Sequence, residues 1–228
     1  LNPKIVRYCI ERNIPITPGT CNPSDVELAI ELGLEVVKFF PAEASGGLDM
    51  IKAMSAPYTN VRFMPTGGIN QKNLTTYLDF PKIIACGGSW MVSGDLIKEG
   101  NFDKIRELTE DALHSMLGFE LAHIGINCEG ESEADEVADA FGKMFGFGKK
   151  TGNSSIFAGS FIEAMKSPYL GKNGHIAIKT RYIDRAVYYL ESQGFELDMD
   201  TAKYKNDKLT AVYLKAQVGG FAIHLVQK

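Results

Sequence analysis

The sequence predicts an α/β protein in two parts, in which parallel strand–helix units precede a second domain built from two repeated modules. In residues 1–117, short apolar runs alternate with amphipathic stretches at a spacing of roughly 20–25 residues, which is typical of parallel βα units. After Gly118 this alternation stops, and another pattern appears twice at a spacing of about 50 residues. We therefore expect one domain over residues 1–117 and a second over residues 118–228.

The composition is that of a globular protein and limits the possible partners. The chain has 228 residues, of which 45% are hydrophobic and 23% charged, with a formal net charge of −4. This balance argues against disorder, and it gives no reason to expect nucleic acid or an anionic membrane as partner. No apolar run reaches the roughly 18 residues of a membrane span, and no signal-peptide pattern is visible. The four cysteines are widely spaced without a CxxC pair, which predicts reduced thiols and a cytoplasmic protein.

The elements of the first half follow from local signals. Residues 3–13 have apolar side chains at helical spacing, and residues 14–17 predict a short buried strand. Asn22-Pro23 is a strong helix start, because it combines a capping side chain with proline at the first helical position. The other predicted elements are a strand at 36–40, a helix at 47–56, a strand at 61–64, a helix at 70–78, a strand at 83–86 and a helix at 102–117.

Lys38 interrupts the apolar strand of residues 36–40. Burial of its ammonium group among Val36, Val37, Phe39 and Phe40 would favour the neutral amine, which is the form that attacks carbonyl carbon. The alternative is a lysine that extends to water at the end of a strand. This stretch therefore predicts either a Schiff-base lysine or an ordinary surface lysine.

Two glycine pairs follow the predicted strands at 61–64 and 83–86. They lie in Thr66-Gly67-Gly68 and Gly87-Gly88-Ser89. Glycines let backbone N–H groups approach an anion, a following helix start would add a positive dipole end, and Ser89 adds a hydroxyl donor. The alternative is a pair of tight turns that need positive φ angles. We also expect Phe40 and Pro18 to line the pocket around Lys38, although Phe40 is equally explained by core packing.

The runs VKFFPAEASGG, RFMPTGGIN and ACGGSW, in this order, resemble the 2-keto-3-deoxy-6-phosphogluconate (KDPG) and 4-hydroxy-2-oxoglutarate (KHG) aldolase family. The resemblance implies the last four βα units of a (β/α)8 TIM barrel, in which Lys38 forms an imine with pyruvate without a cofactor. It implies that both glycine pairs and Ser89 hold the substrate phosphate, that Thr66 lies at the mouth of the site, and that the protein forms a homo-oligomer, a trimer. The catalytic glutamate of the family lies on the first half-barrel, for which this sequence has no counterpart, and we expect a structural role for Glu43.

The second half contains an internal repeat. The runs AHIGIN and GHIAIK correspond, and a Gly-Phe pair follows each of the two predicted helices at 134–145 and 184–193. Together with strands at 121–128, 155–159, 160–166, 174–179, 209–215 and 220–227, they predict an α+β domain of paired βαβββ modules. This pattern resembles the glyoxalase / vicinal-oxygen-chelate (VOC) superfamily over residues 119–228.

The VOC resemblance implies a divalent metal site at His123, Glu163, His175 and His224. Such nitrogen and oxygen ligands suit zinc, nickel, iron or manganese. A histidine at the fourth position departs from the glutamate that is more common there. The alternative is a polar groove in which the strand histidines are hydrogen-bonded without a metal.

The resemblance of the first half therefore implies a class I aldolase that cleaves KDPG or KHG to pyruvate and an aldehyde. Because four βα units leave open sheet edges and lack the general base, we expect the 228-residue chain alone to be inactive and prone to aggregate. The competing hypothesis is a non-catalytic fragment whose function is metal or small-ligand binding by the second domain. The sequence does not distinguish the two aldol substrates.

Overall fold

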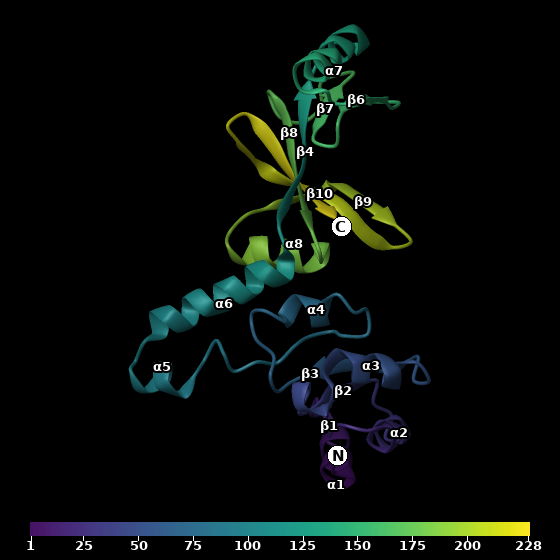
Figure 1. Ribbon diagram of the computed structural model, residues 1–228, viewed down its shortest axis with the longest axis vertical. Coiled ribbons are helices and arrows are strands. Elements are labelled where there is room, and N and C mark those ends of the chain that lie inside the picture. The colour runs from purple at the N-terminus through teal and green to yellow at the C-terminus, as the bar shows by residue number, and fades with distance from the viewer. The chain divides into compact units, whose positions relative to one another are not determined.

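The computed structural model describes all residues from 1 to 228. The chain divides into two compact units, Leu1–Met116 and Leu117–Lys228. Each unit contains its own β-sheet, and the long helix α6 (Phe102–Leu117) ends where the second unit begins (Figure 1). None of the helices is long and apolar enough to cross a membrane.

The sheet of the first unit is parallel and has three strands in the order β1 (Gly19–Thr20), β2 (Val36–Phe39) and β3 (Arg62–Pro65). Lys38 is in register with Gly19 on one side and with Met64 on the other. The segment after β3 continues the parallel arrangement through only two isolated bridges, Phe63 to Ile83 and Thr66 to Gly87. The unit is thus α/β, with the strand ends that carry Lys38 and Thr66 next to each other.

Two predicted strands of this unit differ from the structure. Residues 14–17 are not a strand, and pairing begins only at Gly19, because prolines 15 and 18 have no N–H to donate to a ladder. The Pro18 carbonyl instead accepts the Lys38 N–H at 2.9 Å. Residues 83–86 form no regular strand, and of these only Ile83 makes a bridge, because Pro65 on the facing strand likewise lacks a donor.

Helices of the first unit begin at residues 3, 23, 47 and 102, as the sequence predicts, but the helix expected from residue 70 begins only at Leu74, and the helix at 94–98 has no counterpart in the prediction. Asn2 caps α1 (Pro3–Ile10), and the Asn22 side chain accepts a hydrogen bond from the Asp25 N–H at 3.0 Å at the start of α2 (Pro23–Glu31). The remaining elements are the 3-10 helix η1 (Glu43–Ser45), α3 (Gly47–Ser55), α4 (Leu74–Leu78), α5 (Gly94–Lys98) and α6.

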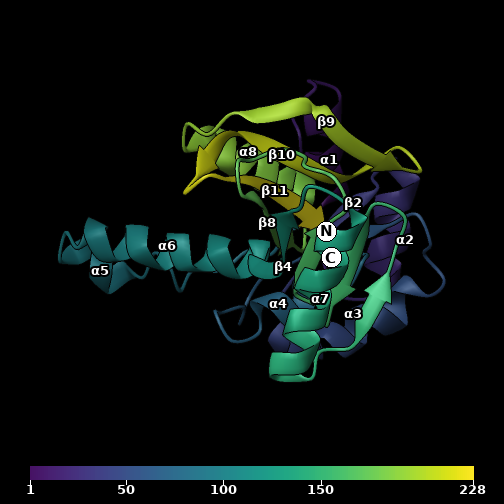
Figure 2. The ribbon, with the colours of Figure 1, turned by 90° about the horizontal axis from the view of Figure 1, so that it is seen from above.

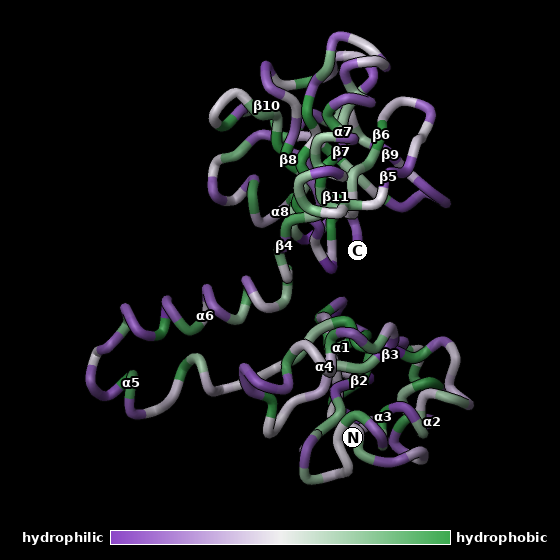
Figure 3. The backbone as a smooth tube through the Cα atoms, turned by 45° about the horizontal axis from the view of Figure 1, so that its top comes forward, coloured by the Kyte–Doolittle hydropathy of each residue, from purple (hydrophilic) through white to green (hydrophobic).

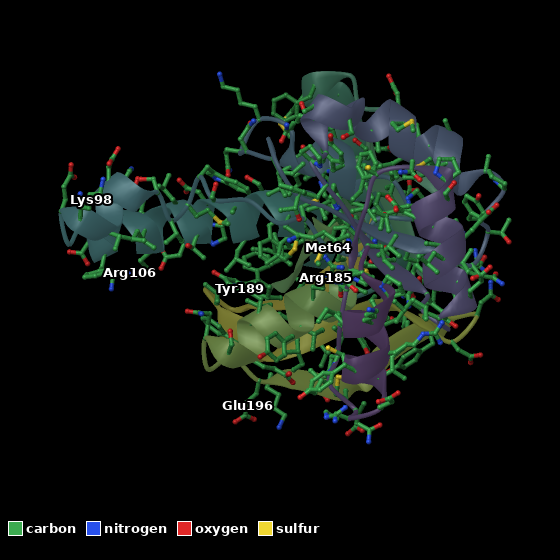
Figure 4. All side chains as sticks on the ribbon, turned by 90° about the horizontal axis from the view of Figure 1, so that it is seen from below. Met64, Lys98, Arg106, Arg185, Tyr189 and Glu196 are labelled. Carbon is green, nitrogen blue, oxygen red and sulfur yellow. The ribbon has the colours of Figure 1, made fainter.

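The two faces of α6 differ in hydropathy. Hydrophobic and hydrophilic segments alternate along α6 and its neighbour α5 in Figure 3. Figure 4 shows the charged side chains of Lys98 on α5 and Arg106 on α6 extending outward from these helices. Arg106 pairs there with Asp103 at 2.5 Å, one turn earlier on the same helix. The pattern matches the amphipathic helix expected at residues 102–117.

The second unit contains one eight-stranded sheet in the order β5-β6-β7-β4-β8-β11-β10-β9. Its two halves have the same sequence of elements, one strand, a helix and three further strands. The first half consists of β4 (Glu120–Asn127), α7 (Glu131–Phe145), β5 (Lys149–Thr151), β6 (Ser155–Ala158) and β7 (Ile162–Met165). The second half consists of β8 (Gly174–Thr180), α8 (Ile183–Ser192), β9 (Leu197–Lys205), β10 (Lys208–Val218) and β11 (Phe221–Gln227).

The halves meet at the antiparallel pair β4–β8, and each first strand pairs in parallel with the last strand of its own half. Helix α7 packs on β6 and β7 through small side chains, including Ala134, Ala138 and Ala164, which are fully buried. Helix α8 lies along β10 and β11, as Figure 2 shows from above. This arrangement brings β4, β7, β8 and β11, the strands that carry the four predicted metal ligands, side by side in the middle of the sheet.

Candidate active site and candidate metal centre

Lys38 lines a cavity of about 430 Å³ in the first unit. Along β2, Val37 and Phe39 are fully buried, whereas Lys38 is only partly buried, because successive side chains of a strand point to opposite faces. The Lys38 Nζ lies 5.9 Å from the centre of the Phe40 ring, and 52% of Phe40 is exposed. The expectation that Lys38 is enclosed by all four apolar neighbours is therefore wrong, since Val37 and Phe39 face away from it.

The other side chains around the cavity come from the ends of neighbouring strands and from the glycine turns. The full lining consists of Lys38, Phe40, Met64, Thr66, Gly67, Gly68, Ile69, Gly87, Gly88 and Ser89. All sequence-predicted residues of this site except Pro18 belong to the lining. Pro18 is buried beside the Lys38 backbone and is not in the lining. Lys38 is the one titratable side chain among the lining residues.

The two glycine pairs require glycine for different structural reasons, namely backbone conformation in the first pair and close approach of a side chain in the second. Gly67 and Gly68 have φ angles of 96° and 83°, which side chains rarely adopt, and a Cβ on Gly68 would lie 2.5 Å from the Glu43 Cγ. Gly87 and Gly88 have no such φ. A Cβ on Gly87 would lie 2.8 Å from the Thr66 Oγ1, so close approach is what requires glycine there.

Several hydrogen-bond donors at the cavity have no acceptor within the protein. The Thr66 hydroxyl oxygen is buried without a hydrogen-bond partner. The backbone N–H groups of both Gly67-Gly68 and Gly88-Ser89 make no hydrogen bond within the protein. Buried polar groups are normally paired, so donors left free at one cavity indicate a place for a ligand with acceptor oxygens.

No helix start contributes to this site. Helix α4 begins at Leu74 and α5 at Gly94, several residues after the respective glycine pairs. The expectation that a helix N-terminus directly follows the glycines is therefore wrong. Any anion bound here would depend on N–H groups, the Ser89 hydroxyl and the charge of Lys38.

Glu43 is not among the residues that line the Lys38 cavity. Its Oε1 accepts a hydrogen bond from the hydroxyl of Tyr77, which is almost completely buried. Burial, together with this bond to a carboxylate, raises the pKa of Tyr77. Because Glu43 is also in contact with Gly68, it supports the glycine turn from behind.

In the second unit, the four predicted metal ligands occupy equivalent places in the two repeats. Figure 1 shows β4 and β8, which carry His123 and His175, side by side. Glu163 on β7 is in register with Gly125 on β4. His224 on β11 is in register with Ala177 on β8. Because AHIGIN corresponds to GHIAIK, Gly125 matches Ala177, and Glu163 therefore matches His224.

Three atoms of this group form what we call the ligand triangle: His123 Nε2, His175 Nε2 and Glu163 Oε2. Its edges are 3.1 Å between the two histidines, 3.1 Å from Glu163 to His123 and 3.2 Å from Glu163 to His175. Atoms that bind a tetrahedral ion at about 2.0–2.1 Å lie about 3.3–3.4 Å apart. The triangle thus has close to the dimensions of one face of a metal coordination sphere.

Hydrogen bonding alone does not account for the ligand triangle. An ionised carboxylate only accepts, and each Nε2 carries at most one proton. If both nitrogens are protonated, two donors face each other, and if only one is protonated, the other nitrogen and the carboxylate face each other as acceptors. At least one edge is therefore unfavourable without a cation between the three atoms.

Ser155 holds the carboxylate of the triangle in place. Its hydroxyl donates to Glu163 Oε1 at 2.6 Å, and Ser155 is only 5% exposed. Burial by itself would raise the pKa of Glu163, but the hydrogen bonds from His123, His175 and Ser155 outweigh it and lower that pKa. Glu163 is therefore ionised at neutral pH, as a metal ligand must be.

The histidines differ in their surroundings. His175 is 3% exposed and its Nδ1 has no partner. A Cβ on Gly125, the residue opposite His175 in the sheet, would lie 2.1 Å from the His175 ring, so glycine makes room for that ring. Burial, and then repulsion by His175 and His123, lowers the pKa of His224 to about 3. The sequence analysis identifies neither Ser155 nor Gly125; the signal that could have indicated Gly125 is the Gly/Ala difference between the two repeats.

Comparisons with known proteins concern chiefly the first half. Residues 1–108 match the aldolase family described as KDPG and KHG aldolase. The 2-dehydro-3-deoxy-phosphogluconate aldolase of Haemophilus influenzae is 53% identical over 113 residues, which cover 50% of this chain and 53% of that protein.

The solved structures described next are each similar to only about half of this chain. One is the KDPG aldolase of Legionella pneumophila with pyruvate captured as a covalent carbinolamine intermediate (39% identity, TM-score 0.46, 47% of this chain and 52% of that one). Another is methylmalonyl-CoA epimerase of Mycobacterium tuberculosis (17% identity, TM-score 0.35, 49% of this chain and 89% of that one). Residues 1–108 are thus similar to the KDPG and KHG aldolases, and the chain spans about half the length of the curated relatives it matches.

Proposed function

We propose that the first unit supplies the imine-forming lysine and the phosphate-binding turns of a class I aldolase acting on KDPG or KHG. The observation that carries the proposal is the cavity that Lys38 lines together with Thr66, both glycine pairs and Ser89. A cationic amine and several free N–H donors in one cavity suit a substrate with a keto group at one end and an anionic group at the other. The likeness of residues 1–108 to KDPG and KHG aldolases supports the same assignment.

The reaction follows from the amine. In its neutral form Lys38 Nζ adds to the C2 carbonyl of the 2-keto acid, and loss of water from the carbinolamine gives a protonated imine. The C3–C4 bond then breaks, its electron pair enters the imine to give the enamine of pyruvate, and the C4 hydroxyl loses its proton as the aldehyde leaves. Protonation of the enamine and hydrolysis of the imine release pyruvate and restore the lysine.

The proton of the C4 hydroxyl requires a base, and no carboxylate lines the cavity. The family resemblance implies a glutamate on barrel strands to which nothing in this sequence corresponds. We therefore propose the activity for a complete barrel, and for the 228-residue chain only the steps that Lys38 can perform, namely carbinolamine and imine formation with pyruvate.

Reductive trapping tests this proposal. Incubation with pyruvate and borohydride should add the mass of the reduced imine to the peptide that contains Lys38, as measured by tryptic mass spectrometry. Lys38→Arg should abolish the adduct, because a guanidinium stays protonated and cannot become the imine nitrogen. Lys52→Arg, a change on the exposed helix α3, is the matched control and should leave the adduct in place. Trapping at another lysine would contradict the proposed role of Lys38.

For the second unit we propose binding of a divalent transition metal by the ligand triangle. The supporting observation is the mutual 3.1–3.2 Å spacing of its three atoms, which hydrogen bonds alone do not explain. Two imidazoles and a carboxylate are a donor set suited to zinc, nickel or iron. Equilibrium dialysis followed by elemental analysis should find one metal ion per chain, and Glu163→Gln should reduce that occupancy. Full occupancy in the variant would argue against the triangle.

A further inference from the structure

All three carbonyl groups of the first glycine turn, Thr66-Gly67-Gly68, are hydrogen-bonded within the protein. The Ala42 N–H donates to the Thr66 oxygen at 2.8 Å, and the Glu43 N–H donates to the Gly67 oxygen at 3.1 Å. Both donors are backbone groups of the segment that follows β2, so these two peptide planes are held without any side chain. The Gly68 carbonyl has no backbone donor and is held in a different way.

Two asparagine side chains donate to the Gly68 carbonyl. The Nδ2 atoms of Asn70 and Asn73 each lie 3.1 Å from its oxygen, and we call this pair of side chains the asparagine clamp. The Asn73 Oδ1 accepts the Asn70 N–H at 2.8 Å, which joins the two residues into one unit. Gly68 is exposed, so water could satisfy its carbonyl. Two amide donors on one exposed oxygen therefore indicate that the direction of this peptide group is what they control.

Asn73 does not cap helix α4, although it occupies the N-cap position. An asparagine side chain at this position normally accepts a hydrogen bond from an N–H of the first helical turn, and Asn73 makes no such bond. A side chain that served only to begin the helix would make it. The side chain of Asn73 is instead used at Gly68.

The asparagine clamp determines where the next N–H group points. In a planar trans peptide the C=O and the following N–H are directed to opposite sides. Because the clamp holds the Gly68 oxygen, the Ile69 N–H is directed away from the clamp. Gly67, Gly68 and Ile69 all line the Lys38 cavity, and none of their N–H groups makes a hydrogen bond within the protein.

We propose that Asn70 and Asn73 are positioning residues, which fix the Ile69 N–H as a third anion donor beside those of Gly67 and Gly68. Three donors match the three terminal oxygens of a phosphoryl group, whereas a carboxylate has only two oxygens. The clamp therefore favours the phosphorylated substrate KDPG over KHG, which carries a carboxylate at that end. This inference rests on the proposed aldolase function and adds to it a choice between the two substrates.

Phosphate titration followed by nuclear magnetic resonance tests the clamp in the full chain. Inorganic phosphate should shift the amide signals of Gly67, Gly68 and Ile69 along one binding curve. A double variant with Asn70→Ala and Asn73→Ala should bind phosphate about 10–150-fold more weakly, the range for one lost hydrogen bond to a charged group. At higher phosphate concentrations its two glycine signals should still shift, because backbone bonds hold their peptide planes, whereas the Ile69 signal should not respond.

Two controls separate this role from a general effect on the fold or on charge. Asn60→Ala changes an exposed asparagine of the same unit outside the Lys38 cavity and should keep the wild-type binding curve. Malonate is a dianion like phosphate at slightly alkaline pH, but each of its ends presents two oxygens. Its affinity should fall less than that of phosphate in the double variant. Equal losses for both anions would overturn the inference, and so would a wild-type Ile69 signal that phosphate leaves unchanged.

The clamp and the aldolase proposal fail in different ways. If pyruvate leaves no reduced adduct at Lys38 while phosphate shifts all three amides as expected, the aldolase assignment is wrong, and with it the choice of KDPG. If the adduct forms and Ile69 does not respond to phosphate, the aldolase assignment stands and the clamp is rejected. Circular dichroism shows whether the double variant is folded. If it is not, Asn70→Ala alone, which leaves one amide on the Gly68 carbonyl, should weaken the Ile69 response selectively, and an unchanged response would reject the clamp.

Discussion

Glu163 and His224 are the same residue position in the two repeats of the second unit, and they differ in what holds them. Glu163 receives a hydrogen bond from Ser155, and His224 stacks on Tyr213. A sheet with near two-fold internal symmetry thus carries a carboxylate on one side and an imidazole on the other. The symmetry places all four side chains in one region, and the contacts that hold Glu163 and His224 differ between the repeats.

Removal of the Ser155 hydroxyl should loosen the ligand triangle. In Ser155→Ala, Glu163 Oε1 loses its buried donor and the carboxylate is free to rotate. We expect metal affinity to fall by about 10–100-fold, as is typical when a residue that orients a metal ligand is lost. The neighbouring exposed residue provides the control, because Ser154→Ala should change nothing. Isothermal titration with Zn²⁺ measures both, and unchanged affinity in Ser155→Ala would remove this residue from the site.

Loss of the Ser89 hydroxyl should discriminate between substrates in a complete enzyme. Ser89 lines the Lys38 cavity next to the free N–H groups of the second glycine pair. In Ser89→Ala, a phosphorylated substrate should bind about 10–150-fold more weakly, which corresponds to one lost hydrogen bond to a charged group. An unphosphorylated 2-keto acid should be affected much less. The ratio of kcat/KM for the two substrates is the measurement, and equal losses on both would exclude a phosphate contact.

High pH should destabilise the second unit through Tyr213. Burial raises the pKa of Tyr213 to about 12, above the ordinary value of 10.0 that it has in the unfolded chain. A raised folded-state pKa means that the stabilisation is fully present below pH 10 and is lost as the pH rises toward 12. This loss is on the order of 2 kcal/mol. Tyr213→Phe lacks the titrating group and should lose less stability over the same interval.

Urea unfolding at a series of pH values measures this difference. Tyr188→Phe is the matched control, since Tyr188 is 75% exposed and its replacement removes a tyrosine without changing a buried site. Parallel curves for the wild-type chain and Tyr213→Phe between pH 10 and 12 would mean that the Tyr213 hydroxyl is not desolvated.

Local sequence signals predicted much of the fold. Capping at Asn22, the alternation around Lys38 and the repeat AHIGIN/GHIAIK all correspond to observed elements. The predictions failed where the partner strand determines whether a segment forms a regular strand. Residues 83–86 look like a strand by composition, but the partner strand ends in Pro65, which has no donor. Strand β9 was not predicted, because as an exposed edge strand it carries charges where a buried strand has apolar side chains.

In the candidate sites, too, the residues with local sequence signals could be predicted, whereas contacts between distant strands could not. Lys38, Thr66 and the glycine pairs could be named from the sequence, because Lys38 lies in a predicted strand, the others directly follow predicted strands, and such strand ends meet at one rim. The contacts that organise the candidate metal centre could not be predicted from the sequence. Whether Ser155 reaches Glu163, and whether His224 approaches the triangle, depends on register and side-chain direction across strands that are far apart in the chain.

The space that Gly125 leaves for His175 limits how alike the two repeats can become. The corresponding residue of the second repeat is Ala177, which lies opposite His123 without conflict. A protein designer who copied the second repeat onto the first would place a methyl group at position 125, 2.1 Å from the His175 ring. A perfectly symmetrical version of this sheet would thus displace one of its own histidines. Because a Cβ atom at position 125 would clash with the His175 ring, position 125 must remain glycine although the equivalent position 177 is alanine. The two halves of the sheet therefore have to differ in sequence at this position.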